Sequence, residues 1–230
     1  MKTVLEVREL TFGYDSGHPC LHDISFSVGE GECVGLVGAN GAGKSTLLWC
    51  LLGLLKAQGV VNVFGEKLRK RNLGRIGVVF QNPEDQLFMP TLLQDVTLPL
   101  LNRGATAEAA AEKAQAALRS MGLEDLGHRP ATQLSLGERK RASLAAALAG
   151  SPEILFLDEP TAELDGRSVR QLTRVLADLP IARVITSHHL DFLRSLASRL
   201  LVLWQGRIVA EGPTQQILSD TSLLESAGLV

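Results

Sequence analysis

The sequence predicts an α/β fold with a mostly parallel sheet, an N-terminal antiparallel β subdomain and an inserted helical subdomain. Apolar and polar side chains alternate through the first thirty residues, a pattern typical of a half-buried antiparallel sheet. Short apolar runs then alternate with helix-like stretches, as expected for parallel strands joined by crossover helices. Residues 81–150 carry no strand signal and include segments of high helix propensity.

The N-terminal part of this fold is expected to begin with two strands. Their alternation covers residues 4–10 and 24–28, and the turn-rich segment 15–19 joins them. A buried strand follows at residues 32–37, where the sequence is an almost continuous apolar run. A helix over residues 45–55 then completes a strand, loop and helix unit.

Further strands are expected where apolar runs recur, and we assign them to the parallel sheet: residues 60–64, 76–80, 154–157, 183–186 and 200–204. Helices over residues 107–121 and 135–149 make up the helical subdomain. A hairpin joins residues 200–204 to 207–210, and a short helix starts at Pro213. We expect one domain over residues 1–230, with the β subdomain and core at about 1–81 and 151–230 and the helical subdomain at about 82–150.

Composition narrows the class of protein. The chain has 230 residues, enough for one sizeable α/β domain with a subdomain. Its formal net charge of −2 argues against a general nucleic-acid binder, although residues 67–75 are locally basic, a run read as a solvated connection. No apolar stretch approaches the roughly 20 residues that span a bilayer, so we expect a cytosolic protein or one peripheral on a membrane partner. Its three widely spaced cysteines favour neither a disulfide framework nor a metal site.

A glycine-rich loop at residues 38–45 carries the strongest chemical signal. It reads Gly-Ala-Asn-Gly-Ala-Gly-Lys-Ser, the spacing of a P-loop nucleotide triphosphatase core. Glycines let backbone N–H groups turn toward phosphates, and a following helix N-terminus adds partial positive charge. Lys44 is suited to the terminal phosphates and Ser45 to Mg²⁺. The loop therefore predicts ATP or GTP binding; a glycine-rich turn with a solvated lysine is the alternative.

Two carboxylates end the apolar run at residues 154–157. Asp158 stands where a Mg²⁺ ion beside the glycine loop needs an acidic partner. Glu159 follows at the same sheet edge, and a carboxylate there can polarise the water that attacks a γ-phosphate, which makes it the candidate general base. An ordinary polar turn after a strand is the alternative.

A third segment with a chemical signal, residues 134–138, is expected to begin a helix. Ser135 and Glu138 have the spacing of a capping box, which a purely structural helix would also show. Taken with the glycine loop and the Asp158-Glu159 strand end, however, this segment closely resembles the nucleotide-binding subunits of ABC transporters. The resemblance covers essentially the whole chain.

That resemblance implies a head-to-tail dimer that sandwiches two ATP molecules. Ser135 and Gly137 would form the family signature, whose helix N-terminus presents N–H groups to the γ-phosphate held by the second subunit. The sequence departs from the family pattern at two signature positions, with Leu136 and Glu138 where a glycine and a glutamine are usual. These departures bear on how tightly the dimer closes and on the rate of hydrolysis.

Four further positions match the family pattern. Gln81 would contact Mg²⁺ and the attacking water, and His188 would hydrogen-bond the γ-phosphate; a polar strand end and a satisfied surface histidine are the alternatives. Tyr14 would stack on adenine, unless it is a hairpin residue packing on its neighbours. Asp165 would contact the partner subunit, a role compatible with helix N-capping. His189 replaces the usual following acid and receives no role.

The cofactors that these assignments imply are ATP and Mg²⁺. The catalytic residues are Glu159, His188, Gln81 and Lys44; those that bind nucleotide are Tyr14, Gly38, Asn40, Gly41, Gly43, Lys44, Ser45, Thr46, Ser135 and Gly137; and those that hold the metal are Ser45, Gln81 and Asp158.

Residues 81–88, Gln-Asn-Pro-Glu-Asp-Gln-Leu-Phe, resemble a segment of the ATPases of cobalt/nickel-type and other energy-coupling-factor importers; a polar turn capping the helical subdomain is the alternative. The resemblance implies an ATPase at the cytoplasmic face of the membrane that powers uptake of a transition-metal ion or vitamin through separate membrane subunits.

Two other functions stay open. A soluble, non-transport ABC ATPase would predict a tandem cassette or a long coiled-coil insertion, and the sequence has neither. A nucleotide sensor with weak turnover stays open because of Leu136 and Glu138. Because both halves of a composite site lie on one chain, a homodimer is expected over a heterodimer; the solute depends on other subunits.

Overall fold

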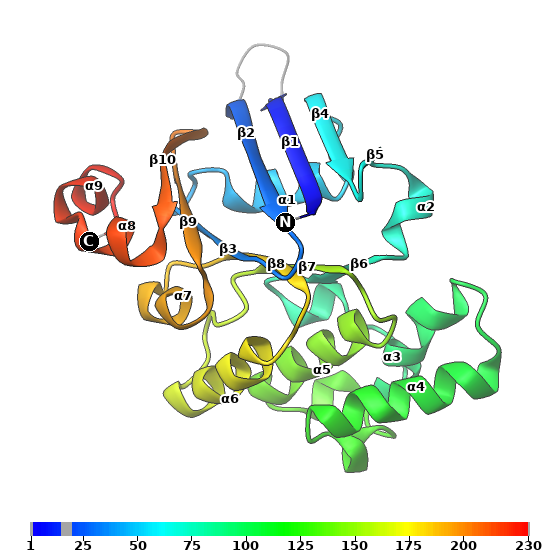
Figure 1. The fold of residues 1–230 in the computed structure, drawn as a ribbon. Helices are drawn as coiled ribbons and strands as arrows, with labels where there is room; N and C mark the ends of the chain where they lie inside the picture. The colour runs from blue at the N-terminus through cyan, green and yellow to red at the C-terminus, as the bar shows by residue number, and fades with distance from the viewer. Residues whose placement is uncertain (1, 15–19, 230) are drawn as a thin grey trace. The chain divides into compact units, whose positions relative to one another are not determined.

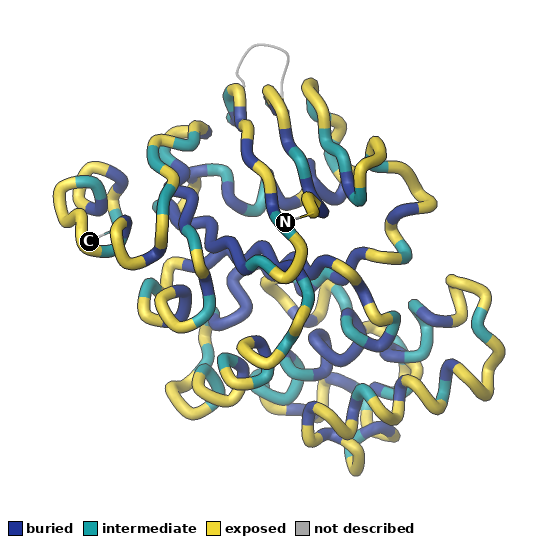
Figure 2. The backbone as a smooth tube through the Cα atoms, in the orientation of Figure 1, coloured by how far each residue is buried: buried dark blue, intermediate teal, exposed yellow. Residues whose placement is uncertain are grey.

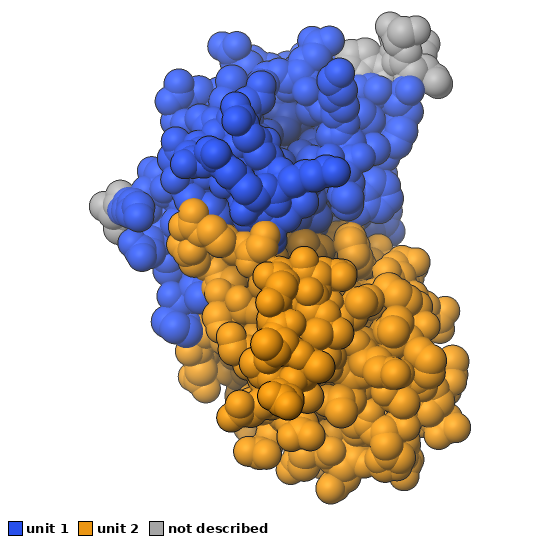
Figure 3. Space-filling view, turned by 90° about the vertical axis from the view of Figure 1, so that its right-hand side faces the viewer, with its two compact units in different colours: residues 1–73, 180–230 blue, residues 74–179 orange. Residues whose placement is uncertain are grey.

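The computed structural model describes residues 2–14 and 20–229, so the predicted turn at 15–19 lies outside the described residues. The chain divides into two compact units (Figure 3). Unit 1 comprises residues 1–73 and 180–230, and unit 2 comprises residues 74–179. The α/β fold class is confirmed, because antiparallel strands, parallel strands and a helical subdomain are all present.

Unit 1 contains the expected antiparallel sheet (Figure 1). Its strands run in the order β2-β1-β4-β5, and each neighbouring pair is antiparallel. Leu5, Leu10 and Ile24 point to its buried face and are fully buried, which accounts for the alternation in the sequence. The bounds are β1 (Thr3–Phe12), β2 (Leu21–Gly29), β4 (Gln58–Val63) and β5 (Glu66–Lys67).

The prediction that residues 60–64 join the parallel sheet is wrong. Strand β4 pairs antiparallel with β1, with Val61 opposite Val7. Phe64 and Gly65 have φ angles of 55° and 78° and turn the chain back into β5. A turn that tight connects antiparallel strands, whereas parallel neighbours need a crossover of a dozen or more residues. An apolar run alone does not tell these two cases apart.

The parallel strands of unit 1 carry the glycine-rich loop. Strand β3 pairs in parallel with both β8 and β9, and β10 pairs antiparallel with β9, which confirms the predicted hairpin. Every residue of β3 and β8 is buried (Figure 2), as expected for strands covered on both faces. The bounds are β3 (Cys33–Val37), β8 (Ala182–Thr186), β9 (Arg199–Trp204), β10 (Arg207–Pro213), α1 (Lys44–Leu51), α2 (Lys70–Leu73), α7 (Leu190–Leu196), α8 (Thr214–Ser219) and α9 (Thr221–Ser226).

Unit 2 combines a parallel strand pair with the helical subdomain. Strands β6 and β7 pair in parallel, with Val79 opposite Leu157. No strand occurs in residues 81–150, all of which the structure describes, and both predicted helices are present. The bounds are β6 (Ile76–Val79), β7 (Ile154–Asp158), α3 (Leu92–Leu101), α4 (Ala107–Ser120), α5 (Leu136–Leu148), α6 (Gly166–Ala177) and the 3₁₀ turns η1 (Pro83–Asp85), η2 (Glu124–Leu126) and η3 (Ala131–Gln133).

Local sequence signals explain where the subdomain helices begin. Thr91 and Gln94 form a capping box at the start of α3, and the Thr106 side chain accepts from the Ala109 N–H at the start of α4. Ala110 and Ala114, one turn apart on α4, are both fully buried, because small side chains let the helix approach its neighbours closely.

The cysteines are free thiols, two of them buried. Burial raises the pKa of the Cys33 thiol to about 11 and that of Cys50 to about 12, so neither forms a thiolate readily. Among the described residues, no helix is long and apolar enough to cross a bilayer. The same residues contain no cluster of three or more His, Cys, Asp or Glu side chains able to hold a metal ion.

Two phenylalanines of unit 2 provide a matched test of this core. Phe156, in β7, is fully buried, whereas the Phe88 side chain is exposed. We expect Phe156→Ala to lower the free energy of unfolding by about 3–5 kcal/mol, because it removes a large apolar side chain and leaves a cavity. Phe88→Ala is expected to change it by about 0.5 kcal/mol or less. Urea denaturation of the nucleotide-free chain measures both; equal losses would contradict the packing described here.

Candidate functional site

The glycine-rich loop follows β3 in unit 1, and three of its glycines are required by geometry. Gly41 and Gly43 have φ angles of 80° and 104°, a left-handed region that other residues rarely adopt. A Cβ atom on Gly38 would lie 2.4 Å from the carbonyl oxygen of Leu203. The loop therefore has a shape that only this glycine pattern allows.

Lys44 is held inside the loop. Its side chain is buried, and its Nζ donates to the carbonyl oxygens of Gly38 at 2.8 Å and Ala39 at 3.2 Å. It is also the first residue of α1, whose N-terminus has no side-chain cap. A buried ammonium group and uncapped helix N–H groups in one loop favour an anion such as phosphate.

Tyr14 lies against the helix that follows the loop. Its Oη is 3.1 Å from Thr46 Oγ1, within hydrogen-bond distance, and its ring packs edge-on against Phe12 with centroids 5.0 Å apart. The side chain is still 61% exposed. The contact with Phe12 is the packing alternative considered above, while the exposed area leaves room for a stacked base.

His188 lies just beyond the end of β8. Thr186 pairs with Leu36 of β3, so His188 and Gly38 each stand two residues past the paired position. The carboxyl ends of parallel strands meet at one sheet edge, which brings His188 to the edge that carries the loop. Its ring contacts that of His189 edge-on at 4.8 Å, and the His189 N–H donates to Ser187 Oγ.

In unit 2, Gln81 and Glu159 lie just beyond the ends of the paired strands β6 and β7. Each stands two residues past the paired positions Val79 and Leu157. Asp158 and Glu159 are buried, at 5% and 6% exposure, whereas Gln81 is exposed. The register of β6 and β7 is consistent with the prediction that Gln81, Asp158 and Glu159 stand at strand ends.

The backbone at Glu159 is strained. Its φ of 42° is left-handed, which for a residue other than glycine costs about 1–3 kcal/mol and persists only where neighbouring contacts fix it. Its carbonyl oxygen accepts from the Ala162 N–H at 3.0 Å and from the Lys140 Nζ at 3.4 Å. Strain of this kind concentrates at functional sites.

Lys140 is a site residue that the sequence interpretation missed. It lies on α5, is only 2% exposed, and donates to the carbonyl oxygens of both Gln81 and Glu159. It also lines a hollow of about 330 Å³ with Gln81 and Glu163. The sequence did hold a signal, because Lys140 precedes Leu144 by one helical turn and so falls on the apolar face of the helix.

The signature-like helix start forms the capping box that the sequence predicts. Ser135 Oγ accepts from the Glu138 N–H at 3.3 Å, and the Ser135 N–H donates to Glu138 Oε2 at 2.8 Å. The Ser135 hydroxyl also donates to that carboxylate, and these bonds hold the pKa of Glu138 below its usual value. The side chain of Glu138 is therefore anionic and committed to Ser135 at the N-terminus of α5.

Gly137 and Asp165 lie at neighbouring helix starts. A Cβ atom on Gly137 would lie 2.9 Å from the Ser168 Oγ, so this glycine permits close packing of α5 and α6. Asp165 is the N-cap of α6, and its Oδ1 accepts from the Ser168 N–H at 2.7 Å. That bond lowers the pKa of the Asp165 carboxyl. The helix N-cap interpretation of Asp165 is confirmed.

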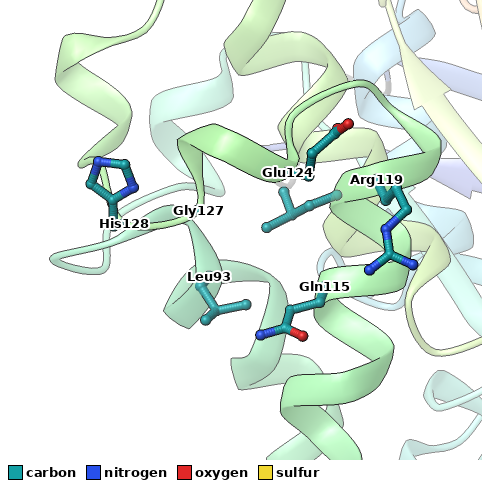
Figure 4. A pocket seen from close by; sticks show the side chains of 7 residues that line it. Leu93, Gln115, Arg119, Glu124, Gly127 and His128 are labelled. Atoms are coloured by element: carbon teal, nitrogen blue, oxygen red, sulfur yellow. The ribbon is translucent and has the colours of Figure 1, made fainter.

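The predicted residues thus form one set in each unit. Unit 1 brings together the glycine-rich loop, Tyr14 and the strand end at His188. Unit 2 brings together the strand ends at Gln81 and Glu159, which Lys140 links to the helix that Ser135 begins. No predicted site residue lines the separate surface hollow of about 230 Å³ shown in Figure 4, whose lining includes Leu93 of α3, Arg119 of α4 and His128, which follows η2.

Comparison with known proteins assigns the family. A family model described as ABC transporter matches residues 21–162, more than half of the chain. The chain belongs to this family. ABC transporter ATP-binding domains bind and hydrolyse ATP, so this protein is an ATPase.

Relatives extend over almost the whole chain. A putative ABC transporter ATP-binding protein of Gloeobacter violaceus is 44% identical over 98% of this chain and 95% of its own length. An energy-coupling factor transporter ATP-binding protein, EcfA, of Methanothermobacter thermautotrophicus is 39% identical over 98% of this chain and 76% of its own length.

Solved structures share the fold. That of cbiO1 from Clostridium perfringens, described as part of the ABC transporter complex cbiONQ, has a TM-score of 0.86 and 29% identity, covering 100% of this chain and 96% of that one. A dimeric post-hydrolysis structure of the ATP-binding cassette MJ0796 with ADP and Pi has a TM-score of 0.82 and 29% identity, covering 91% and 98%.

Substitution at Gly43 tests the loop geometry. Besides its φ of 104°, Gly43 has the Leu21 Cδ2 only 2.9 Å from the position of an added Cβ. We expect Gly43→Ala to weaken ATP binding by about tenfold or more, since left-handed strain costs about 1–2 kcal/mol before the clash is counted. Gly122→Ala is the control, because Gly122 has a φ of 65° and open space around it. Fluorescent-ATP titration measures both; similar affinities in the two variants would contradict this geometry.

Proposed function

We propose that this chain is the ATPase subunit of an energy-coupling-factor type importer, which powers uptake of a transition-metal ion or a vitamin. It would act at the cytoplasmic face of the membrane, bound to separate membrane subunits, with no nucleic acid involved. Two similar proteins support this class. A relative with 39% identity is named energy-coupling factor transporter ATP-binding protein EcfA, and a structural neighbour is described as part of the cbiONQ transporter complex. The structural support comes from the segment 81–90.

This segment is anchored to the helical subdomain and exposes an aromatic side chain. Gln86 donates to the Ser143 carbonyl on α5 at 2.8 Å, and its Oε1 accepts from the Phe80 N–H. Phe88 is 67% exposed. An exposed aromatic ring on a hydrogen-bonded segment can serve as an anchor that fills a pocket of a partner protein.

Asp95 fixes the backbone beneath that exposed ring. The carboxylate is buried on α3, and its Oδ1 accepts from the N–H groups of Phe88 and Met89, each at 2.8 Å. Burial raises the pKa of the Asp95 carboxyl, while these two bonds lower it. Because both N–H groups are held by one carboxylate, the turn at Phe88 has a defined shape, and a membrane subunit would contact it there.

In unit 1, ATP would be bound at the glycine-rich loop. Residues of the glycine-rich loop, Asn40 and Thr46 among them, would hold the phosphates, and Tyr14 would stack on adenine. Its hydrogen bond to Thr46 supports that assignment, since it keeps the ring beside the loop. Ser135 and Gly137 would contact the γ-phosphate bound to a second copy of the chain, which makes the active form a homodimer or a heterodimer with a related ATPase.

Mg²⁺ is the metal that this chemistry requires. The residues assigned to it, Ser45, Gln81 and Asp158, offer a hydroxyl, an amide and a carboxylate oxygen, and such hard oxygen ligands suit Mg²⁺. The buried carboxylate of Asp158 fits the same role. When bound, the ion would neutralise charge that develops on the phosphate oxygens.

Hydrolysis would be carried out by groups at the strand ends. Glu159 would accept a proton from the water that attacks the γ-phosphorus, and the bond to the β-phosphate oxygen would break to release ADP and phosphate. Gln81 would orient the same water, while His188 and Lys44 would hydrogen-bond the γ-phosphate. The left-handed backbone of Glu159 supports this role, because a backbone held in one conformation limits the positions that the side-chain carboxylate can take.

One observation favours weak turnover, as in the nucleotide-sensor function considered above. Glu138 places an anionic carboxylate at the helix start that would face the γ-phosphate, and like charges there oppose closure. The chain would then act as a slow ATPase that responds mainly to nucleotide binding.

Exposure of Phe88 provides the test of the importer function. We expect the wild-type chain, expressed with an affinity tag in its own host, to retain integral membrane proteins when purified from detergent extracts. Phe88→Asp is expected to lose them while keeping its basal ATPase rate, because the charge disrupts an apolar contact outside the nucleotide site. Val209→Asp is the matched control, since Val209 is also exposed but lies on β10 of unit 1.

Mass spectrometry identifies the proteins that co-purify with each variant. Recovery of the same membrane proteins with wild type and Phe88→Asp, or recovery of ribosomal proteins with both, would contradict the proposed docking of a membrane subunit.

A further inference from the structure

Lys140 joins parts of the site that the proposed function assigns to two different nucleotides. Its side chain lies on α5, five residues after Ser135, the residue that caps that helix. Its Nζ donates to the carbonyl oxygen of Gln81 and, at 3.4 Å, to that of Glu159. One buried ammonium group thus connects the signature-like helix to the ends of β6 and β7.

The two ends of this connection would serve different ATP molecules. Gln81 and Glu159 would act on the ATP bound by their own chain, whereas Ser135 and Gly137 would contact the ATP bound by the partner. A displacement of α5 toward the partner's nucleotide would therefore be transmitted by Lys140 to the backbone of Gln81 and Glu159.

The surroundings of Lys140 make the connection stiff. The residue is 2% exposed. Its charge faces three carboxylates, those of Glu163, Asp158 and Glu159, which oppose the lowering of its pKa by burial. A buried cation without such partners would be expelled or neutralised. Lys140 is thus held in place by the residues it connects.

A second contact runs alongside the first. Gln86 donates to the Ser143 carbonyl at 2.8 Å, so the segment after β6 is bound to α5 at two points that lie about one helical turn apart. The left-handed backbone of Glu159 needs neighbouring contacts to persist, and the Lys140 ammonium supplies one of them. Loss of Lys140 therefore loosens the strand ends and the helix from each other.

We propose that Lys140 is a positioning residue that couples the two nucleotide sites of the dimer, so that ATP bound at one site promotes binding and hydrolysis at the other. The proposal rests on the function proposed above, since it requires two composite sites. It concerns the link between the sites and not the chemistry within either one.

The test measures the ATP dependence of hydrolysis in Lys140→Met, a change that keeps the length and apolar stem of the side chain but removes its donors and charge. We expect the wild-type rate to be sigmoidal in ATP, with a Hill coefficient above 1. In Lys140→Met we expect a Hill coefficient of about 1, with the half-saturating ATP concentration raised about fivefold or more, because the coupling between sites is lost.

Three further variants make the result specific. Lys140→Arg keeps the charge and the donors and is expected to restore sigmoidal kinetics, which a variant that merely perturbed packing would not do. Lys113→Met, at an exposed lysine of α4, is the matched control and should behave as wild type. Should Lys140→Met fail to fold, Lys140→Leu replaces it; leucine also lacks the charge and the donors, so the same kinetics are expected.

Each unfavourable outcome has a distinct meaning. A Hill coefficient of 1 in the wild-type chain, or a sigmoidal curve in the folded Lys140→Met or Lys140→Leu chain, overturns the coupling role. Failure of the composite-site function itself would be seen separately, as a wild-type specific activity that does not rise with protein concentration.

Discussion

The register of two pairs of parallel strands positions most of this site. In unit 1, the pairing of Leu36 with Thr186 brings the start of the glycine-rich loop and His188 to the same sheet edge. In unit 2, the pairing of Val79 with Leu157 does the same for Gln81 and Glu159. Each of these pairs is held by side chains that are almost all buried. A shift of one residue in either register would separate these groups, so their placement depends on the buried side chains of the strands.

Three of the buried charged side chains hold the backbone in a particular shape. The Lys44 ammonium binds the loop carbonyls from within, Asp95 holds two N–H groups below Phe88, and Lys140 holds the strand ends of unit 2. Burying such a charge is unfavourable unless its hydrogen bonds are made. The same contacts therefore stabilise the fold and define the geometry of the nucleotide site and of the surface proposed to meet a membrane subunit.

Local rules explain why much of this was predictable from the sequence. The capping box of Ser135 and Glu138 and the left-handed backbone at Gly41 and Gly43 depend on local conformation, and both are present as expected. The sheet that β4 joins was not predictable from its apolar run, because the tight turn at Phe64 and Gly65 decides it. Lys140 was missed for a related reason: a lysine is ordinarily read as solvated, and its burial depends on carbonyl oxygens 59 and 19 residues away in the sequence.

The central claim is that each nucleotide site is completed by a second copy of this chain. Mixing two inactive variants tests it: Lys44→Ala lacks the lysine of the glycine-rich loop, and Ser135→Arg blocks the signature-like helix start. In the mixed dimer, the loop of one variant meets the helix start of the other, so one of its two sites is intact. Because half of the dimers in an equal mixture are mixed, the account predicts that ATP hydrolysis recovers to about a quarter of the wild-type rate at most. A mixture as inactive as its separate components would contradict it.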